Sequence, residues 1–61
     1  MKVMERELYT DKNGRTAEII RHPKGYRVTI WEGWSITFRE VFLKYSDAFG
    51  HIDGMNFVVM K

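Results

Sequence analysis

The sequence predicts an α+β fold in which a four-stranded antiparallel meander carries one C-terminal helix packed on one face (ββββα). Two observations predict the sheet: apolar and polar residues alternate in four successive segments, and turn-forming residues separate those segments. A third observation predicts the helix, because the apolar spacing near the C-terminus changes from two residues to three and four. This C-terminal segment is also the only one left to cover the apolar face of the sheet.

Length and composition predict a single small globular domain, residues 1–61. A chain of this size buries only about 60% of the surface that its unfolded form exposes, which leaves no room for a second lobe. The chain has no cysteine, which excludes disulfides and zinc–thiolate sites and suits a reducing compartment. The N-terminal segment lacks the apolar core of a signal peptide, and no apolar run reaches the roughly 18 residues of a membrane span. We therefore expect a cytoplasmic protein with no membrane partner.

The clearest alternation runs from Tyr26 to Phe38 and predicts a hairpin with one apolar face. A two-residue loop at 32–33 would place every apolar residue of one strand opposite a polar residue of the other. A three-residue loop at 31–33 avoids this and puts Gly33 at the left-handed position of a type I turn with a G1 bulge. This register pairs Ile30 with Trp34, Val28 with Ile36 and Tyr26 with Phe38.

Two further turns extend this hairpin into a meander. The Asn13-Gly14 pair favours a two-residue type I′ turn. That turn pairs Lys12 with Arg15, Leu8 with Ile19 and Thr10 with Ala17, and it directs Tyr9 to the opposite face. Segment 22–25 predicts a type I turn, with Pro23 supplying the fixed φ and Gly25 a left-handed exit. It pairs Arg21 with Tyr26, Ile19 with Val28 and Ala17 with Ile30. The three turns agree on one apolar face: Leu8, Ala17, Ile19, Tyr26, Val28, Ile30, Trp34, Ile36 and Phe38.

A helix is predicted from Asp47 to Val59, with Ser46 as its N-cap. Two glycines oppose this prediction, because Gly50 and Gly54 would each cost about 1 kcal/mol in a helix interior. The segment 57–59 also favours a strand, so a short helix followed by a fifth strand is the alternative. The two glycines lie four apart, where they allow close approach to the sheet or to a second copy of the chain. The apolar face of the predicted helix consists of Ala48, Phe49, Ile52, Met55 and Val59.

Three short segments carry a resemblance to known proteins. They are Lys24-Gly25-Tyr26 at the start of a strand, 39–42 at the end of one, and Tyr45-Ser46 before the helix, within a pattern that runs from about residue 18 to 59. This pattern resembles short uncharacterised proteins of bacteriophages that infect marine cyanobacteria. The resemblance implies a small viral accessory protein without an assigned activity, located in the cytoplasm of the host cell. It transfers no functional residue.

No catalytic, cofactor-binding or metal-binding residue is predicted, and we expect a protein that is not an enzyme. Catalysis needs a nucleophile or an acid–base pair in a pocket that excludes water, and the sequence contains no such pattern. His51 and Asp53 diverge on a helix and His22 lies in a turn, so these side chains do not converge as metal ligands do. No glycine-rich phosphate motif follows a predicted strand. No cofactor and no small-molecule substrate are expected.

Partner binding is the more plausible activity. The face opposite the helix is expected to display Tyr9, Glu18, Ile20, Arg27, Thr29, Ser35, Thr37 and Arg39, with Trp31 near the hairpin tip. Trp31 either folds back over its own hairpin or serves as an exposed anchor, because tryptophan is enriched at interface hot spots. The candidate partner-binding residues are Trp31, Ile20, Arg27, Thr29, Thr37 and Arg39.

Two classes of partner fit this face. In one, the face, a sheet edge or the glycine side of the helix binds a protein, either a second copy or a host target. In the other, the arginines and threonines contact DNA or RNA, as the sheets of some DNA-binding domains do. The net charge is only +2, and Glu5, Glu7, Glu18 and Glu32 are expected on this face or its margin, where they oppose phosphate binding. We therefore predict a protein partner or homodimer ahead of nucleic acid.

Overall fold

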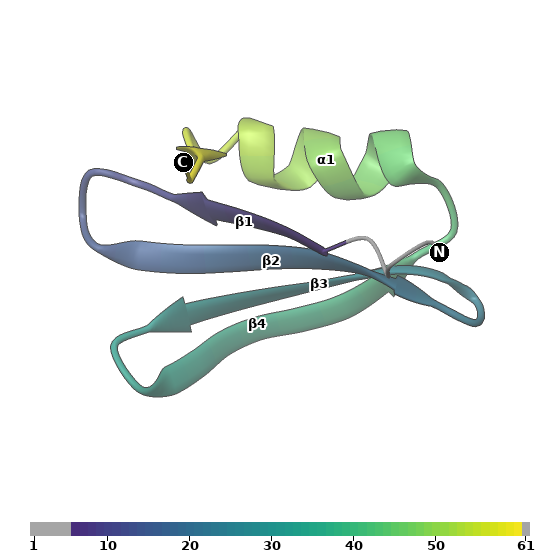
Figure 1. The fold of residues 1–61 in the computed structure, drawn as a ribbon, viewed down its shortest axis with the longest axis horizontal. Helices are drawn as coiled ribbons and strands as arrows, with labels where there is room; N and C mark the ends of the chain where they lie inside the picture. Colours follow the sequence, from purple (N-terminus) through teal and green to yellow (C-terminus); the bar gives the residue numbers. More distant parts are fainter. Residues whose placement is uncertain (1–5, 61) are drawn as a thin grey trace.

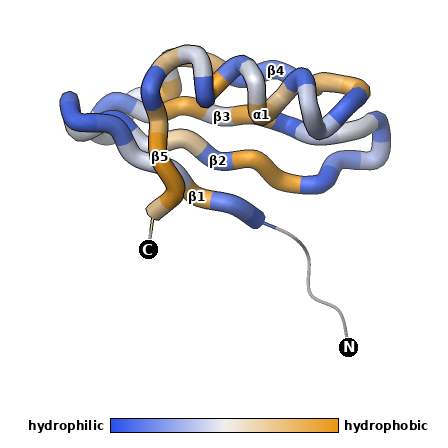
Figure 2. The backbone as a smooth tube through the Cα atoms, turned by 90° about the horizontal axis from the view of Figure 1, so that it is seen from above, coloured by the Kyte–Doolittle hydropathy of each residue, from blue (hydrophilic) through white to orange (hydrophobic). Residues whose placement is uncertain are grey.

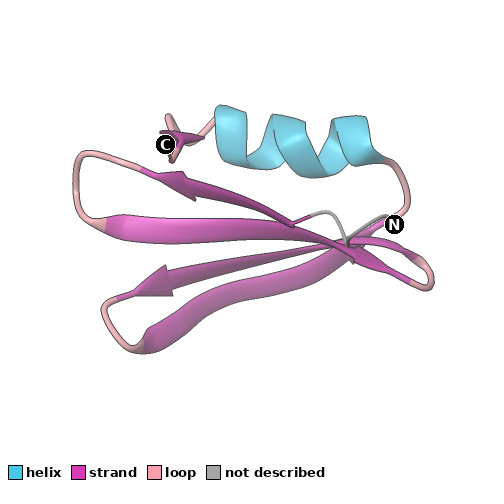
Figure 3. Cartoon of the chain, viewed as in Figure 1, coloured by secondary structure: helices cyan, strands magenta, loops and turns pink. Residues whose placement is uncertain are grey.

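The computed structural model describes residues 6–60 and contains a five-stranded antiparallel sheet with one helix on one face (Figures 1 and 3). The strand order is β4-β3-β2-β1-β5. The predicted α+β fold with four meandering strands and a C-terminal helix is confirmed, and a short fifth strand pairs with β1. Within the described range, no helix is long and apolar enough to span a membrane. The elements are β1 (Arg6–Thr10), β2 (Arg15–His22), β3 (Gly25–Glu32), β4 (Ser35–Phe42), α1 (Tyr45–Asp53) and β5 (Val58–Val59).

The C-terminal segment follows the alternative prediction, a short helix and then a strand. The helix begins two residues earlier than predicted, at Tyr45, and its N-cap is Lys44 rather than Ser46. It ends at Asp53, so the prediction of a helix to Val59 is wrong. The chain then reverses through Asn56, whose φ of 68° is left-handed. This reversal buries Phe57 in the core and brings two β-branched valines to the edge of β1, which explains why the helix stops.

The β1–β2 turn is one residue longer than predicted, and the register shifts with it. Tyr9 pairs with Ala17 and Thr10 with Thr16, and the backbone N–H of Asp11 donates to the carbonyl oxygen of Arg15 (3.2 Å). These pairs leave a three-residue loop at 12–14 in place of the type I′ turn. The cause is the carboxylate of Asp11, whose Oδ1 accepts hydrogen bonds from the backbone N–H of Asn13 (3.0 Å) and of Arg15 (2.8 Å). A one-residue slip reverses both faces of a strand. Tyr9 therefore faces the helix, and Leu8 faces the opposite side.

The β3–β4 turn is shorter than predicted. Glu32 pairs with Ser35, so the loop is only Gly33 and Trp34, and the φ of 64° at Gly33 fits the first central position of a type II′ turn. A β-bulge follows, because Trp31 pairs with Ile36 whereas the preceding residue of β3 pairs with Phe38. The predicted loop at 31–33 is wrong. The predicted positions of the two tryptophans are also reversed. Trp34 is fully exposed at the tip, and Trp31 is half-buried within β3.

The β2–β3 turn has the predicted register throughout. Arg21 pairs with Tyr26, and the pairing extends to His22 with Gly25. Gly25 has a φ of 144°, and a Cβ atom there would lie 2.1 Å from the carbonyl oxygen of Phe42. Only glycine allows β4 to pass this close.

The core lies between α1 and the sheet. Of the predicted apolar face, Ala17, Ile19, Val28 and Ile30 are buried, while Tyr26 and Phe38 pack against this core. Leu8, Trp34 and Ile36 were predicted in the core and lie outside it, for the register reasons given above. Figure 2 shows an apolar stretch within β2 and the apolar β5 beside β1. The remaining core residues are Tyr9, Ala48, Ile52 and Phe57, with Phe42 and Met55 packed against them.

The two helix glycines do not bring α1 closer to the sheet. A Cβ atom at Gly50 would meet nothing within 4 Å, and at Gly54 its nearest neighbour is the carbonyl oxygen of Gly50 at 3.2 Å. Gly54 is the C-cap of the helix. Close approach to the sheet therefore explains neither glycine.

Candidate functional site

The face of the sheet opposite α1, called the open face below, is covered by no element of residues 6–60 (Figure 1). Its side chains follow from the register, because residues paired across antiparallel strands point to the same side. Three cross-strand rows result. They are Arg6–Ile20–Arg27–Val41, Leu8–Glu18–Thr29–Arg39 and Thr10–Thr16–Trp31–Ile36.

Five of the six candidate partner-binding residues share this face: Trp31, Ile20, Arg27, Thr29 and Arg39. Thr37 is the exception, because it is the extra residue of the bulge and its hydroxyl donates to the carbonyl of Ile30 (3.3 Å). The prediction that Tyr9 and Ser35 share the open face is wrong, since the two registers turn both residues to the helix side.

The open face also carries apolar side chains that sequence reasoning did not place there. Leu8 and Ile36 were expected in the core, and Val41 was assigned to no surface. Ile36 and Val41 are exposed, whereas Leu8, Ile20 and Trp31 are half-buried. These five apolar side chains are distributed over four strands, with polar residues of the three rows between them. To place these residues on the open face from the sequence, the lengths of two turns must be predicted correctly. Side-chain interactions decide those lengths.

The charge on this face is more positive than the sequence predicted. Glu18 is only 6% exposed, and its Oε2 lies 2.6 Å from Nε of Arg6. Glu7 and Glu32, expected on this face or its margin, lie on the helix side of the sheet, opposite Ile19 and Arg15. Glu5 lies outside the described residues. Among the residues of the three rows, arginines outnumber carboxylates by three to one.

Two polar atoms on the open face are buried without a hydrogen-bond partner in the described part of the chain. They are Nε of Arg27 and Oγ1 of Thr29, and Thr29 as a whole is only 1% exposed. An unpaired buried polar group costs about 1–3 kcal/mol, so these two atoms lower the stability of the sheet.

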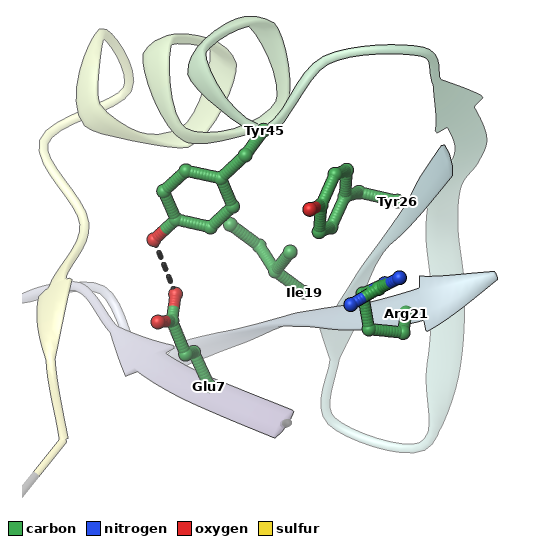
Figure 4. A pocket seen from close by; sticks show the side chains of 5 residues that line it. All are labelled: Glu7, Ile19, Arg21, Tyr26 and Tyr45. Carbon is green, nitrogen blue, oxygen red and sulfur yellow. Dashed lines mark hydrogen bonds between the residues drawn. The ribbon is translucent and has the colours of Figure 1, made fainter. Parts of the chain in front are cut away.

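A second feature, called the tyrosine pocket below, lies on the helix side at the other end of the sheet (Figure 4). It has a volume of about 330 Å³ and is lined by Glu7, Ile19, Arg21, Tyr26 and Tyr45. The Oε1 atom of Glu7 accepts hydrogen bonds from the hydroxyls of Tyr9 (2.7 Å) and Tyr45 (2.5 Å). The rings of Tyr26 and Tyr45 meet edge to face, with centroids 5.4 Å apart. Sequence reasoning missed this pocket, because its residues come from four elements.

The hydroxyls in this pocket are fixed as hydrogen-bond donors. Burial, and then the hydrogen bond to Glu7, raise the pKa of both Tyr9 and Tyr45 above the ordinary value of tyrosine. Both tyrosines stay protonated at neutral pH. They hold the Glu7 carboxylate in place and do not act as bases.

The histidines have structural contacts. His51 stacks on Phe38, and Nδ1 of His22 accepts a hydrogen bond from the backbone N–H of Lys24 (3.0 Å). Across residues 6–60, no group of three or more histidine, cysteine, aspartate or glutamate side chains is placed to hold a metal ion.

The chain matches no protein-family model, no curated protein and no solved structure. Inferences about function therefore rest on the open face, its hairpin tip and the tyrosine pocket.

Proposed function

We propose that this chain is a small non-enzymatic binding protein that acts through protein–protein contacts on the open face and at the adjoining Trp34. The observation that carries the proposal is the full exposure of Trp34, in the same hairpin as the exposed Ile36 and the half-buried Trp31. In the described part of the chain no other residue covers Trp34, so its whole side chain is available to a partner. Exposed apolar surface is typical of protein interfaces, and tryptophan is enriched at their hot spots.

The composition of the face supports a protein partner. Five apolar side chains provide the area, and the arginines at its centre and rim provide polar contacts, an arrangement that interfaces share. The partner is a second copy of the chain or a host protein. The resemblance to short bacteriophage proteins supports placing this role among viral accessory functions in the cytoplasm of a host cell.

The experiment compares variants at the tip with a matched control. Trp34→Ala and Ile36→Ser remove exposed apolar side chains from the proposed surface, whereas Leu43→Ser removes one that is 81% exposed at the opposite end of β4. Sedimentation equilibrium measures self-association, and cross-linked capture from host lysate measures binding of another protein. We expect the tip variants to lose the complex and Leu43→Ser to keep it. A monomer without a captured partner, or equal binding by all variants, contradicts the proposal.

A second candidate function, binding of DNA or RNA, is favoured by the charge of the open face. Three arginines share it with one carboxylate, and that carboxylate is buried and paired with Arg6. Nucleic-acid affinity depends chiefly on phosphate contacts and falls steeply with salt.

The matched variants for this candidate are Arg39→Gln on the open face and Arg21→Gln on the helix side. We expect salt-dependent binding of mixed-sequence DNA or RNA to weaken only in Arg39→Gln. Absence of binding by the wild-type chain at low ionic strength removes this candidate.

A further inference from the structure

The tyrosine pocket is independent of the open face and has a charge of opposite sign at each end. Figure 4 shows Glu7 and Arg21 on opposite sides of the pocket, with Ile19 between them and the two tyrosine rings along the other side. Glu7 pairs with Ile19 across β1 and β2, and Arg21 lies two residues further along β2. Strand geometry therefore separates the Cα atoms of Glu7 and Arg21 by about 8 Å.

The negative end has one oxygen available to a ligand. Both tyrosine hydroxyls donate to Oε1 of Glu7, and Oε2 has no hydrogen-bond or ion-pair partner within residues 6–60. The two hydroxyl donors hold the carboxylate in one orientation. An ammonium group of a ligand could donate a third charge-assisted hydrogen bond, to Oε2, and the carboxylate would not have to reorient to accept it.

The positive end is also positioned and available. The guanidinium carbon of Arg21 lies 5.5 Å from the ring centroid of Tyr26, a cation–π distance. No carboxylate of the described chain forms an ion pair with this side chain. Its N–H groups can therefore bind a carboxylate in the bidentate geometry that arginine favours.

The floor and walls between the two charged ends are apolar. Ile19 is 2% exposed and forms the floor, while the rings of Tyr26 and Tyr45 form two walls with their planes 74° apart. The volume of about 330 Å³ lies at the small end of the range for ligand sites, which is about 300–1,000 Å³. A simple cation would be repelled by Arg21, and a simple anion by Glu7.

We propose that the tyrosine pocket binds a small zwitterion with an apolar body, and specifically a free α-amino acid with an apolar or aromatic side chain. Its ammonium group binds Oε2 of Glu7, its carboxylate binds the guanidinium of Arg21, and its side chain lies on Ile19 between the tyrosine rings. The pocket and the ligand are both small, so we expect a dissociation constant on the order of 1 mM.

The test is an NMR titration of the ¹⁵N-labelled full chain with L-phenylalanine, to about 20 mM, which exceeds the expected dissociation constant. N-acetyl-L-phenylalanine, which lacks the positive charge, and L-phenylalaninamide, which lacks the negative charge, serve as matched ligands. We expect L-phenylalanine to shift the amide resonances of residues around the pocket. Each charge-blocked ligand should bind at least about tenfold more weakly, the effect of losing one charge-assisted bond. No shift with L-phenylalanine, or equal binding of a charge-blocked ligand, overturns the proposal.

Variants separate this site from the open face. Glu7→Gln retains an oxygen that accepts both tyrosine hydroxyls, and Arg21 is exposed, so Glu7→Gln and Arg21→Gln are expected to fold. Each should weaken L-phenylalanine binding by at least about tenfold. Trp34→Ala should leave L-phenylalanine binding unchanged. Failure of the function proposed for the open face would therefore not count against the tyrosine pocket. Unchanged binding in both pocket variants, with native amide spectra, contradicts the proposal.

Discussion

The imidazole ring of His51 in α1 stacks on the phenyl ring of Phe38 in β4, with centroids 4.5 Å apart and ring planes 17° from parallel. Phe42 also approaches this imidazole, at 5.6 Å between centroids. The contact joins the helix to β4, which is one of the two edge strands of the sheet. The aromatic cluster therefore closes the core at the β4 edge.

Removing this contact should destabilise the fold. We expect Phe38→Ala to lower the free energy of unfolding by about 2 kcal/mol, because the ring is half-buried against the core. A double-mutant cycle with His51→Ala should give a coupling energy of about 0.5–1.5 kcal/mol, measured by urea denaturation. A coupling energy near zero would mean that the two rings contribute independently.

Gly25 should tolerate no side chain. In Gly25→Ala the new Cβ atom would lie 2.1 Å from the carbonyl oxygen of Phe42, at a φ of 144°. We expect a loss of at least about 2 kcal/mol of unfolding free energy. Gly14→Ala is the matched control, because its φ of 85° is strained but the space around it is open. The control should lose about 1 kcal/mol. If thermal or urea denaturation gives equal losses of unfolding free energy for the two variants, the close contact with β4 is relieved at little energetic cost.

Gly50 should be replaceable with a gain in stability. It lies within α1, and a Cβ atom there meets nothing within 4 Å. Gly50→Ala should raise the free energy of unfolding by about 0.5–1 kcal/mol, because alanine loses less backbone entropy in a helix. A decrease that depends on protein concentration would instead indicate that a second copy packs on this side of the helix.

Asp11 should make part of the stability dependent on acid pH. Burial by itself raises the pKa of Asp11, but hydrogen bonds from the backbone and side chain of Arg15 and from Asn13 outweigh it and lower the pKa below 3.8. Because the pKa is lower in the folded state, the stabilisation is fully present above about pH 4 and is lost as the pH falls through the folded value. The stability difference between wild type and Asp11→Asn should therefore shrink below about pH 4. A difference that stays constant through acid pH would contradict this assignment.

The residues of the candidate site that were predicted correctly depend on which alternate positions of a strand face the same side, and not on the exact cross-strand partner of each residue. Arg39 was predicted on the open face although the predicted β3–β4 register was wrong. Tyr26 was expected opposite Phe38 and pairs with Phe42, a shift of four residues that leaves odd and even positions unchanged. Ile20, Arg27 and Thr29 were placed correctly because the β2–β3 turn was correct. Leu8 was not, because β1 is shifted by one residue relative to the prediction. Ile36 was not, because the bulge makes the shift three residues at its position in β4.

The sequence by itself determined the strand segments, the central turn at 22–25 and the presence of a covering helix. These features depend on local preferences: the alternation of apolar residues, the fixed φ of Pro23 and the freedom of Gly25. The length of the β1–β2 turn also depends on a local contact, the hydrogen bonds that the Asp11 carboxylate accepts from two backbone N–H groups, but the prediction from Asn13-Gly14 did not include it. Tertiary structure alone decided the β3–β4 register, in which a bulge places Phe38 against the core. A slip of one residue costs little locally but reverses a whole strand, so only the packing of both faces determines which tryptophan is half-buried and which is fully exposed.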